Sequence, residues 1–300
     1  MAATGDHRRA EPAPARPRGG SAIEEHVASG EGERRYRLIW SPTGSDGAPV
    51  AKARLVLMHG YAEHCRRYDE LSQYLLERGY EVWRFDSRGH GQSSGQRGHV
   101  SDFSDYVAEL VNEVASARQS QPELPVFLLG HSNGGLAAIL AVEAGLAGVA
   151  GLILSSPLLG LRKKAVPDVL ARLLSAVAPR LPLPNGLRAQ DLTHDPQVIA
   201  AHQNDRAVHH VATPRWYWSM TQAGRRASEA AARVQLPLLT LRAENDPIVD
   251  SARILGFHER AGSPDKEIVT LAGARHEVLN ELDRIDTFKR VADWLDRVRG

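Results

Sequence analysis

The sequence predicts an α/β fold with a mostly parallel central sheet, helices on both faces and one inserted helical cap. Three observations predict it. Short apolar runs alternate with segments of helical spacing between residues 53 and 154. One of these runs ends in Gly130-His-Ser-Asn-Gly134 and continues directly into an apolar helical segment. Roughly 75 residues without a strand signal then follow Pro157, too many for a simple loop. Such an alternation implies right-handed crossovers and a sheet covered on both sides.

Composition favours an enzyme-sized globular protein. The chain has 300 residues, and its 42% hydrophobic content is enough to bury a large core. The formal net charge is only +1 and the basic residues are spread along the chain, so no nucleic-acid partner is expected. The lone cysteine, Cys65, excludes an internal disulfide and fits a reducing compartment. Because no Cys/His spacing resembles a ligand set, we expect no metal.

The first 20 residues are rich in Pro, Ala and Arg and lack large apolar side chains, which predicts a disordered tail at 1–20. The sequence shows neither the apolar core of a signal peptide nor a run of about 18 uncharged apolar residues. We therefore expect a cytoplasmic protein that at most touches membranes peripherally. The predicted core comprises 21–156 and 234–300, with the cap at 157–233.

The elements before the cap follow from local patterns. Arg34 to Trp40 alternates like a strand, and the glycine at the end of 68–79 stops a helix. We expect Ser101 to cap a helix that runs to about Ser120. The remaining strands are predicted at 53–58, 80–85, 126–130 and 149–154.

The cap begins with Arg162-Lys-Lys164, followed by a stripe of apolar residues at helical spacing from Val166 to Val177. The simpler interpretation is a helix packed on its own domain, and the alternative is a lid that faces lipid. Four histidines of the cap lack ligand spacing and are expected on the surface or just behind the site: His194, His202, His209 and His210.

After the cap, a strand is predicted at 236–241, and Asp250 is expected to cap the helix that follows it. A last strand is predicted at 266–271 and a closing amphipathic helix at 283–298.

Ser132 is the predicted nucleophile, because a strand, a tight turn and a helix meet at this residue. So sharp a turn leaves no room for side chains two residues before and after the serine, which Gly130 and Gly134 satisfy. The start of the helix also favours negative charge. The stretch Gly91-Gln-Ser93-Ser-Gly95 has the same spacing, but no apolar helix follows it, and its glycines suit a loop.

A serine hydroxyl needs a base within hydrogen-bond reach and an acid that orients the base. Asp246 and His276 each follow a predicted strand, and the order Ser132, Asp246, His276 is the one expected of α/β-hydrolases. Glu244 lies closer to its strand, and Asp250 is better explained as a helix cap. A turn-forming Asp before proline and a loop histidine are the alternative interpretations.

Attack on a carbonyl carbon creates an oxyanion, which backbone N–H groups stabilise well. Asn133, directly after the nucleophile, should supply one N–H. The loop after strand 53–58 should supply the other, at Tyr61 just beyond His59-Gly60.

Several motifs together resemble the monoglyceride lipase and lysophospholipase family of α/β-hydrolases over residues 30–297. They are His59-Gly-Tyr-Ala-Glu-His64 with Arg67-Tyr68, Phe85-Asp-Ser-Arg-Gly-His-Gly-Gln-Ser93, Gly130-His-Ser-Asn-Gly-Gly135, Glu244-Asn-Asp246 and His276-Glu-Val-Leu279. The resemblance implies a helical cap, cleavage of single-chain acylglycerols or lysophospholipids, and no cofactor. It also implies that Glu63 and Arg67 hold the oxyanion turn and meet the polar head of the substrate; a surface ion pair of little energetic value is the alternative. Two positions depart from the family pattern, Asn133 for a frequent Met or Gln and Ala62 for a common second Gly.

The expected function is a serine hydrolase that cleaves monoacylglycerols through an acyl-enzyme. A lysophospholipase or a broader carboxylesterase is the alternative with the same chemistry. A catalytically silent hydrolase fold that binds a ligand is the alternative of another class, and the complete triad argues against it. We further expect the helix 166–177 to gate an apolar tunnel and to make reversible contact with anionic lipid surfaces.

Overall fold

The computed structural model describes residues 16–300 apart from 31, 46, 49, 164 and 165. Most of the predicted tail, residues 1–15, therefore lies outside the described residues. Within the rest of that range, the backbone of Arg18 exchanges two hydrogen bonds with the Gln73 side chain. The first strand opens at Gly20, so the described fold starts before residue 21.

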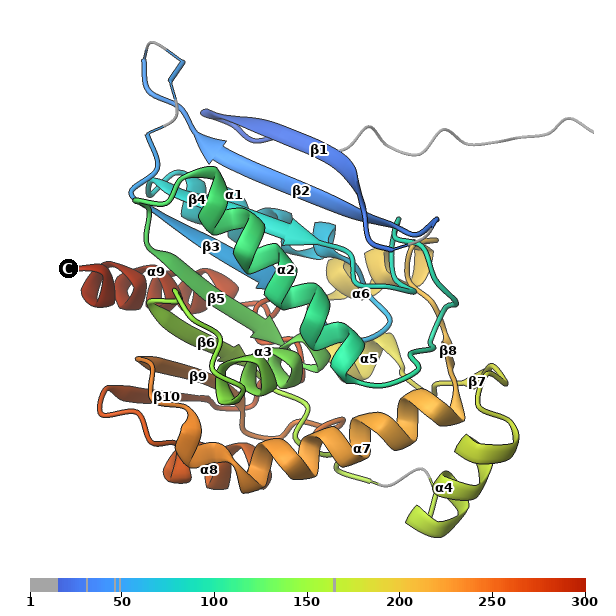
Figure 1. The fold of residues 1–300 in the computed structure, drawn as a ribbon. Helices are drawn as coiled ribbons and strands as arrows, with labels where there is room; N and C mark the ends of the chain where they lie inside the picture. The colour runs from blue at the N-terminus through green and yellow to red at the C-terminus, as the bar shows by residue number, and fades with distance from the viewer. Residues whose placement is uncertain (1–15, 31, 46, 49, 164–165) are drawn as a thin grey trace, which may run out of the picture.

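A twisted eight-stranded sheet forms the centre of the molecule (Figure 1). Its order is β1-β2-β4-β3-β5-β6-β9-β10. Strand β2 pairs antiparallel with β1 and β4, and all later neighbours are parallel. The strands are β1 (Gly20–Ala28), β2 (Arg34–Pro42), β3 (Ala53–Met58), β4 (Tyr80–Phe85), β5 (Val126–His131), β6 (Gly151–Ser155), β9 (Leu238–Ala243) and β10 (Lys266–Leu271). The loops that follow β3, β5, β9 and β10 consequently emerge at the same edge, where ligands bind in such sheets.

Helices cover both faces of the sheet (Figure 1). Alternate residues of β5 show why: Val126 and Leu128 belong to one hydrophobic cluster, and Phe127 and Leu129 to another. Neighbouring side chains of a strand point to opposite faces, so each face builds its own core. The first cluster includes α2 (Ser104–Ser120), α3 (Asn133–Glu143) and α8 (Ser251–Arg260), and the second includes α1 (Asp69–Leu76) and α9 (Arg284–Arg299).

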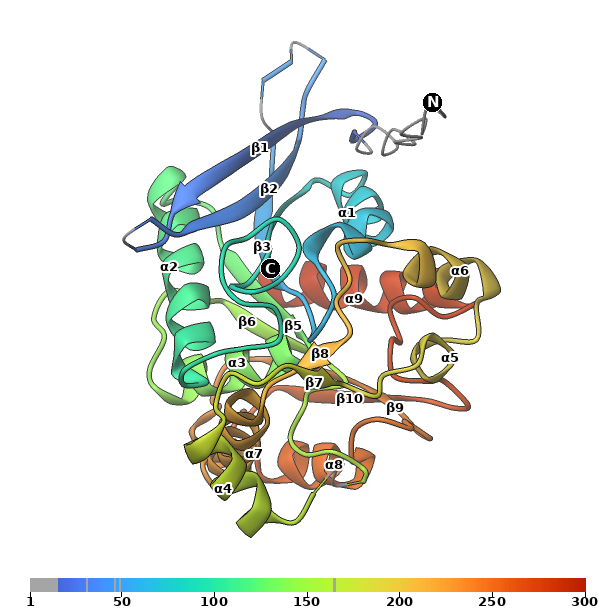
Figure 2. The same cartoon turned by 90° about the vertical axis from the view of Figure 1, so that its right-hand side faces the viewer.

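We refer to residues 157–233, between β6 and β9, as the cap. It lies over the carboxyl ends of the parallel strands (Figures 1 and 2). Its elements are α4 (Asp168–Val177), β7 (Leu183–Pro184), α5 (Ala189–Leu192), α6 (Pro196–Asn204), β8 (Val211–Ala212), α7 (Pro214–Glu229) and the 3-10 turn η2 (Ala231–Arg233). A second 3-10 turn, η1 (Cys65–Tyr68), precedes α1. Trp216 and Met220 of α7 reach into the core beside α3, which anchors the cap.

Two local expectations were wrong. Strand β1 was not expected, because all of its side chains are exposed or half-buried and leave no apolar alternation in the sequence. Helix α2 begins at Ser104, and Ser101 does not cap it. Asp102 instead accepts a hydrogen bond from the Ser104 backbone N–H at 2.9 Å, which leaves Ser101 outside the helix.

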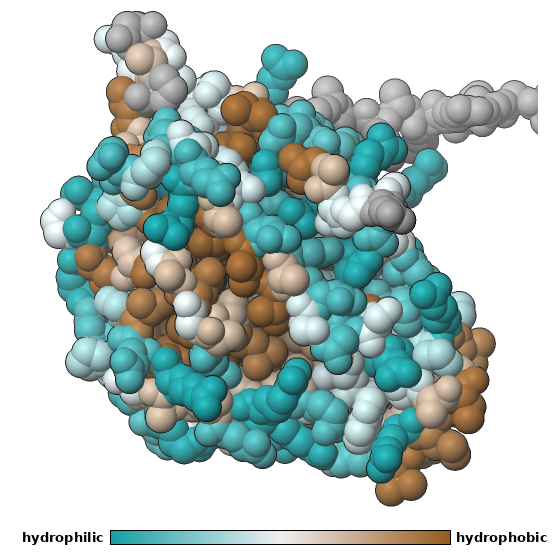
Figure 3. Space-filling model, viewed as in Figure 1, coloured by the Kyte–Doolittle hydropathy of each residue, from teal (hydrophilic) through white to brown (hydrophobic). Residues whose placement is uncertain are grey.

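Helix α4 packs only part of its apolar stripe on its own domain. Val169, Leu173 and Val177 are 82%, 56% and 69% exposed. Figure 3 shows the resulting brown cluster where α4 lies. Val166 and Leu174 of the same stripe instead line an internal cavity. Lys164 of the basic segment lies outside the described residues. In the described part of the chain, no helix has both the length and the apolar character needed to cross a membrane.

Candidate active site

Ser132 occupies a strained turn between β5 and α3. Its backbone has φ 50° and ψ −112°, in the left-handed half of the map that residues with side chains rarely adopt. A Cβ at Gly130 would lie 2.5 Å from the Gly134 carbonyl oxygen, and one at Gly134 would lie 2.3 Å from the Met58 carbonyl oxygen. Both positions therefore admit only glycine. The tight turn that they allow places Ser132 at the edge of the sheet.

Ser93, the other serine with this spacing, has a structural environment. Its hydroxyl donates to the Asp86 carbonyl oxygen at 2.5 Å and accepts the Tyr36 backbone N–H at 2.9 Å. These bonds tie the loop after β4 to strand β2 and occupy the hydroxyl group. Ser93 is not part of the cavity wall that contains Ser132.

Asp246 and His276 are hydrogen-bonded to each other. Asp246 Oδ2 accepts a hydrogen bond from His276 Nδ1 at 2.7 Å, and both residues are buried. The second carboxylate oxygen of Asp246 accepts the backbone N–H groups of Ile248 and Val249 at 2.8 and 2.9 Å. With Nδ1 donating to Asp246, Nε2 of His276 is left as an acceptor, which a general base requires. Of the two alternative acids, Asp250 caps α8.

The electrostatics of this pair favour its charged form. Burial lowers the pKa of His276, but the Asp246 carboxylate outweighs it, so the pKa lies above the ordinary value of 6.5. Burial likewise raises the pKa of Asp246, whereas His276 and the two backbone N–H groups lower it below 3.8. The pair can accept a proton from a neighbouring hydroxyl without leaving an unpaired buried charge.

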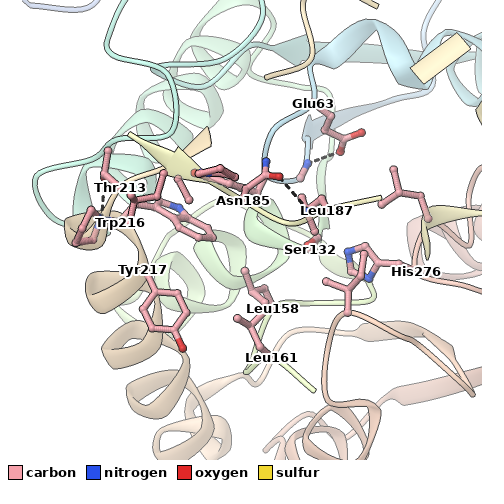
Figure 4. A pocket seen from close by; sticks show the side chains of 18 of the residues that line it. Glu63, Ser132, Leu158, Leu161, Asn185, Leu187, Thr213, Trp216, Tyr217 and His276 are labelled. Atoms are coloured by element: carbon pink, nitrogen blue, oxygen red, sulfur yellow. Dashed lines mark hydrogen bonds between the residues drawn. The ribbon is translucent and has the colours of Figure 1, made fainter. Parts of the chain in front are cut away.

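Ser132 and His276 point into the same cavity, which has a volume of about 190 Å³ (Figure 4). Most of its wall is apolar and comes from the cap and the loop after β6, including Leu158, Leu161, Val166, Leu174, Leu183, Leu187, Leu192, Trp216 and Tyr217. The polar side chains of the wall, besides Ser132 and His276, are those of Glu63, His131, Asn185, His202, Thr213, Tyr61, Tyr217, Trp216 and Glu277. The cavity thus combines a mostly apolar wall with a smaller polar part that includes the nucleophile.

The carboxylate of Glu63 supports the turn after β3 through hydrogen bonds. Its Oε1 accepts the Gly60 backbone N–H at 2.5 Å and the Tyr68 hydroxyl at 2.7 Å. Burial raises the pKa of Glu63, but the charges of His131 and Arg67 outweigh it and bring the pKa to about 2. Ala62 of the same turn has φ 67°, a conformation that favours glycine and accounts for the glycine common at this position in the family pattern.

Arg67 lies behind the cavity wall and links two residues that do line it. Its side chain is 7% exposed, pairs with Glu63 Oε2 at 3.0 Å and also pairs with Glu277. Within the described residues, Arg67 is not part of the cavity wall, whereas Glu63 is. The pair expected to meet the head group is thus divided into one wall residue and one supporting residue.

Sequence reasoning did not name four polar residues of the wall, His131, Asn185, Thr213 and Glu277, and it expected His202 only on the surface or just behind the site. His131 lies next to the nucleophile, and its pKa is lowered to about 4 by burial and by the charge of His276. Glu277 follows His276 directly, and that adjacency was the available signal. His202 comes from α6 of the cap, and no local pattern could place it there. His194 and His210 are exposed, while His209 is buried. Among the described residues, no group of three or more His, Cys, Asp or Glu could hold a metal ion.

Three comparisons with known proteins each find similar chains. The model of the family described as "Serine aminopeptidase, S33" matches residues 49–283. Monoacylglycerol lipase of Mycolicibacterium smegmatis is 32% identical over 280 residues, covering 92% of this chain and 98% of that protein. Phospholipase YtpA of Bacillus subtilis is 34% identical over 253 residues, covering 83% and 96%.

The crystal structure of Paleococcus ferrophilus monoacylglycerol lipase matches with a TM-score of 0.77 and 30% identity. The match covers 88% of this chain and 99% of that chain. The residues matched by the family model, 49–283, include the cap and the loops that carry Ser132, Asp246 and His276.

Proposed function

The chain belongs to the monoglyceride lipase and lysophospholipase family of α/β-hydrolases, and from this premise we propose that it cleaves monoacylglycerols to fatty acid and glycerol. At the coarser level it is a serine ester hydrolase. The observation that carries the finer proposal is the composition of the cavity. The mostly apolar wall suits one acyl chain, and the smaller polar part that includes Ser132 suits a small hydroxylated head.

The proposed reaction uses the three residues in fixed roles. His276 Nε2 takes the hydroxyl proton as Ser132 Oγ attacks the ester carbonyl carbon, and the carbonyl oxygen becomes an oxyanion between the N–H groups of Tyr61 and Asn133. The intermediate collapses, the C–O bond to glycerol breaks, and His276 gives its proton to the leaving oxygen. Water then attacks the acyl-enzyme with His276 as base and releases the fatty acid. Asp246 holds the imidazole in the required tautomer throughout.

Charge in the polar part of the cavity favours a neutral head group. Glu63 and Glu277 both line the cavity, and Arg67 behind them compensates only one negative charge. A phosphate close to these carboxylates would be repelled, whereas glycerol hydroxyls can donate to them. Lysophospholipids remain the second candidate, because one of the relatives is named a phospholipase.

A substrate panel tests the proposal. Rates on a monoacylglycerol, a lysophosphatidylcholine, a diacylglycerol and a short p-nitrophenyl ester should be compared at equal enzyme concentration. We expect the monoacylglycerol to give the highest kcat/KM. A clear preference for lysophosphatidylcholine would transfer the assignment to the second candidate. Hydrolysis of none of them by a folded protein would instead support a ligand-binding role.

The exposed face of α4 supports a second proposal, that the cap makes reversible contact with lipid surfaces. Val169, Leu173 and Val177 lie on the outside, while Leu174 of the same helix lines the cavity. Such a helix can contact a lipid surface on one side and the acyl chain on the other. The basic residues Arg162 and Lys163 just before it suit an interface with anionic lipid.

A further inference from the structure

The side chain of Tyr61 is enclosed by the cap, although its backbone belongs to the turn after β3. Its ring stacks on the Trp216 ring of α7, with 3.6 Å between centroids and an interplanar angle of 21°. His90 and His209 contact it edge-on, at centroid distances of 5.5 and 5.2 Å. Tyr61 is thus held by two cap residues and by one core loop residue.

The Tyr61 hydroxyl extends this attachment. It donates to the Val211 carbonyl oxygen at 2.9 Å and lies 3.2 Å from the Gly98 carbonyl oxygen. The Gly98 oxygen also accepts the Thr213 backbone N–H at 2.9 Å. A Cβ at Gly98 would lie 2.3 Å from the Val211 oxygen, so the two backbones are in direct contact. The hydroxyl therefore sits where the turn after β3, the loop after β4 and the cap strand β8 converge.

The residues next to these contacts add further hydrogen bonds between the cap and the core. Thr213 caps α7 by accepting the Trp216 backbone N–H at 3.3 Å, so the residue bonded to Gly98 also orients the stacking helix. On the other side of Tyr61, the Ala62 carbonyl oxygen accepts the His209 backbone N–H at 3.1 Å. Cap residues 209–216 consequently hold both members of the turn, including the residue with the left-handed backbone.

We infer that the Tyr61 side chain and Trp216 are positioning residues, which make the oxyanion hole a joint product of core and cap. The inference rests on the proposed function, in which the Tyr61 N–H receives the oxyanion. Hydrogen bonds weaken steeply with misalignment, and preorganised donors are worth most when they need no adjustment. Because cap residues hold the Tyr61 side chain, the position of the cap relative to the core sets the direction of the Tyr61 backbone N–H.

This role predicts a particular kinetic signature. An interaction made only with the oxyanion lowers kcat when it is weakened and leaves ground-state binding unchanged. Loss of one complete donor costs roughly 10²–10³ in kcat in other hydrolases, so misaligning it should cost about tenfold. A merely structural role for the ring would change stability without this selective loss.

The primary variant is Tyr61→Phe, which keeps the ring and its stacking and removes the hydroxyl bonds. On a soluble short p-nitrophenyl ester we expect kcat to fall about tenfold and KM to stay within about twofold. Tyr80→Phe is the matched control. Its hydroxyl donates to Asp296 at 2.7 Å at the opposite end of the parallel strands, and we expect its kcat to equal that of the parent.

A pair of ketones separates oxyanion binding from other effects. Ser132 Oγ adds to the carbonyl carbon of a trifluoromethyl ketone, its proton passes to His276, and the carbonyl oxygen takes the negative charge. The corresponding methyl ketone binds without forming this adduct. Tyr61→Phe should weaken the trifluoromethyl ketone by the same factor as kcat and leave the methyl ketone unchanged.

Retention of both kcat and trifluoromethyl ketone affinity in folded Tyr61→Phe would overturn the inference and leave the proposed function intact. Should that variant not fold, Trp216→Phe reduces the stacking instead and is judged by the ratio of the two ketone affinities. An unchanged ratio there would equally overturn it. If Ser132→Ala retains hydrolysis, or the parent forms no adduct, the proposed function itself is wrong.

Discussion

Ser132 depends on groups from separate loops, so the proposed triad should behave as a unit. Ser132→Ala, His276→Ala and the double variant should each lose roughly 10⁴-fold or more in kcat, with the double variant no worse than the singles. Steady-state rates on a soluble ester measure this. Ser93→Ala is the control: it loses two structural hydrogen bonds and some stability, but little kcat. Activity abolished in folded Ser93→Ala and kept in Ser132→Ala would reverse the assignment.

The same pair predicts the pH dependence of the reaction. His276 acts as a base only when neutral, and its pKa is raised above 6.5 by Asp246. The rate kcat/KM should therefore rise with pH along a limb whose midpoint lies above pH 6.5. Asp246→Asn removes the raising charge, so the limb should move to lower pH while kcat falls by roughly 10⁴. A limb that stays in place in this variant would contradict the electrostatic role of Asp246.

Ala62 permits a stability test at one residue. Its φ of 67° is unfavourable for any residue with a Cβ, and Ala62→Gly removes that cost but adds chain entropy to the unfolded state. We expect the free energy of unfolding to rise by up to about 1 kcal/mol, measured by urea denaturation. A clear destabilisation would mean that the buried methyl group contributes more than the strain costs.

At the scale of elements, α4 has one apolar face exposed to solvent and another towards the cavity. Val169→Asp with Leu173→Asp adds charge only to the outer face and should sharply reduce co-sedimentation with anionic vesicles. Activity on long-chain monoacylglycerol should fall severalfold, and activity on a soluble short ester should change little. The pair Leu282→Asp and Ile285→Asp, also exposed but near the start of α9, controls for added charge. No vesicle binding by the parent protein would end the membrane proposal.

Elements with a clear apolar pattern were predictable, and those whose position depends on a partner were not. Strands β3, β4 and β10 have the expected limits, because each is a dense run bounded by turn residues. Strand β1 lacks any buried face and left no such pattern. For α4, periodicity specified an apolar stripe but not which half of it would meet the cavity and which the solvent.

The candidate site divides in the same way. Ser132, Asp246 and His276 could be picked out because each lies in the turn or loop after a strand, at a predictable edge of the sheet, and their catalytic roles remain predictions. His202, Trp216 and the Tyr61 stacking partners could not, because the cap brings them to the site through contacts distant in sequence. Local spacing carries no information about such contacts.

For the whole molecule, buried histidines predict sensitivity to acid. Burial lowers the pKa of seven of them below 6.5: His59, His90, His99, His131, His202, His209 and His258. For His131 and His209 the folded-state pKa is about 4. Between pH 6.5 and about 4 the unfolded chain therefore binds more protons at these groups, and the stability that they contribute above pH 6.5 is lost as the pH falls.

Other groups oppose this trend. Burial raises the pKa of Glu109 to about 7 and that of Glu143 to about 8, so both take up protons in the folded state. The raised pKa values of His64 and His276 act in the same direction. We expect the more numerous histidines to outweigh these groups, so that Tm falls by several degrees from pH 7 to pH 5, measured calorimetrically at constant ionic strength. An unchanged Tm over this interval would show that the opposing groups cancel the effect of the histidines.

The attachment of Tyr61 to the cap also bears on how members of this family could exchange parts. Because the cap is one uninterrupted insertion between β6 and β9, recombination could transfer it between relatives as a cassette. The transferred helix α7 would arrive with Trp216 but without its stacking partner Tyr61, which lies 155 residues earlier in the chain, between β3 and α1. If Trp216 positions Tyr61 as inferred above, a functional chimera has to carry Tyr61 along with the donor's cap, and the cap and the turn after β3 would then be inherited as a pair.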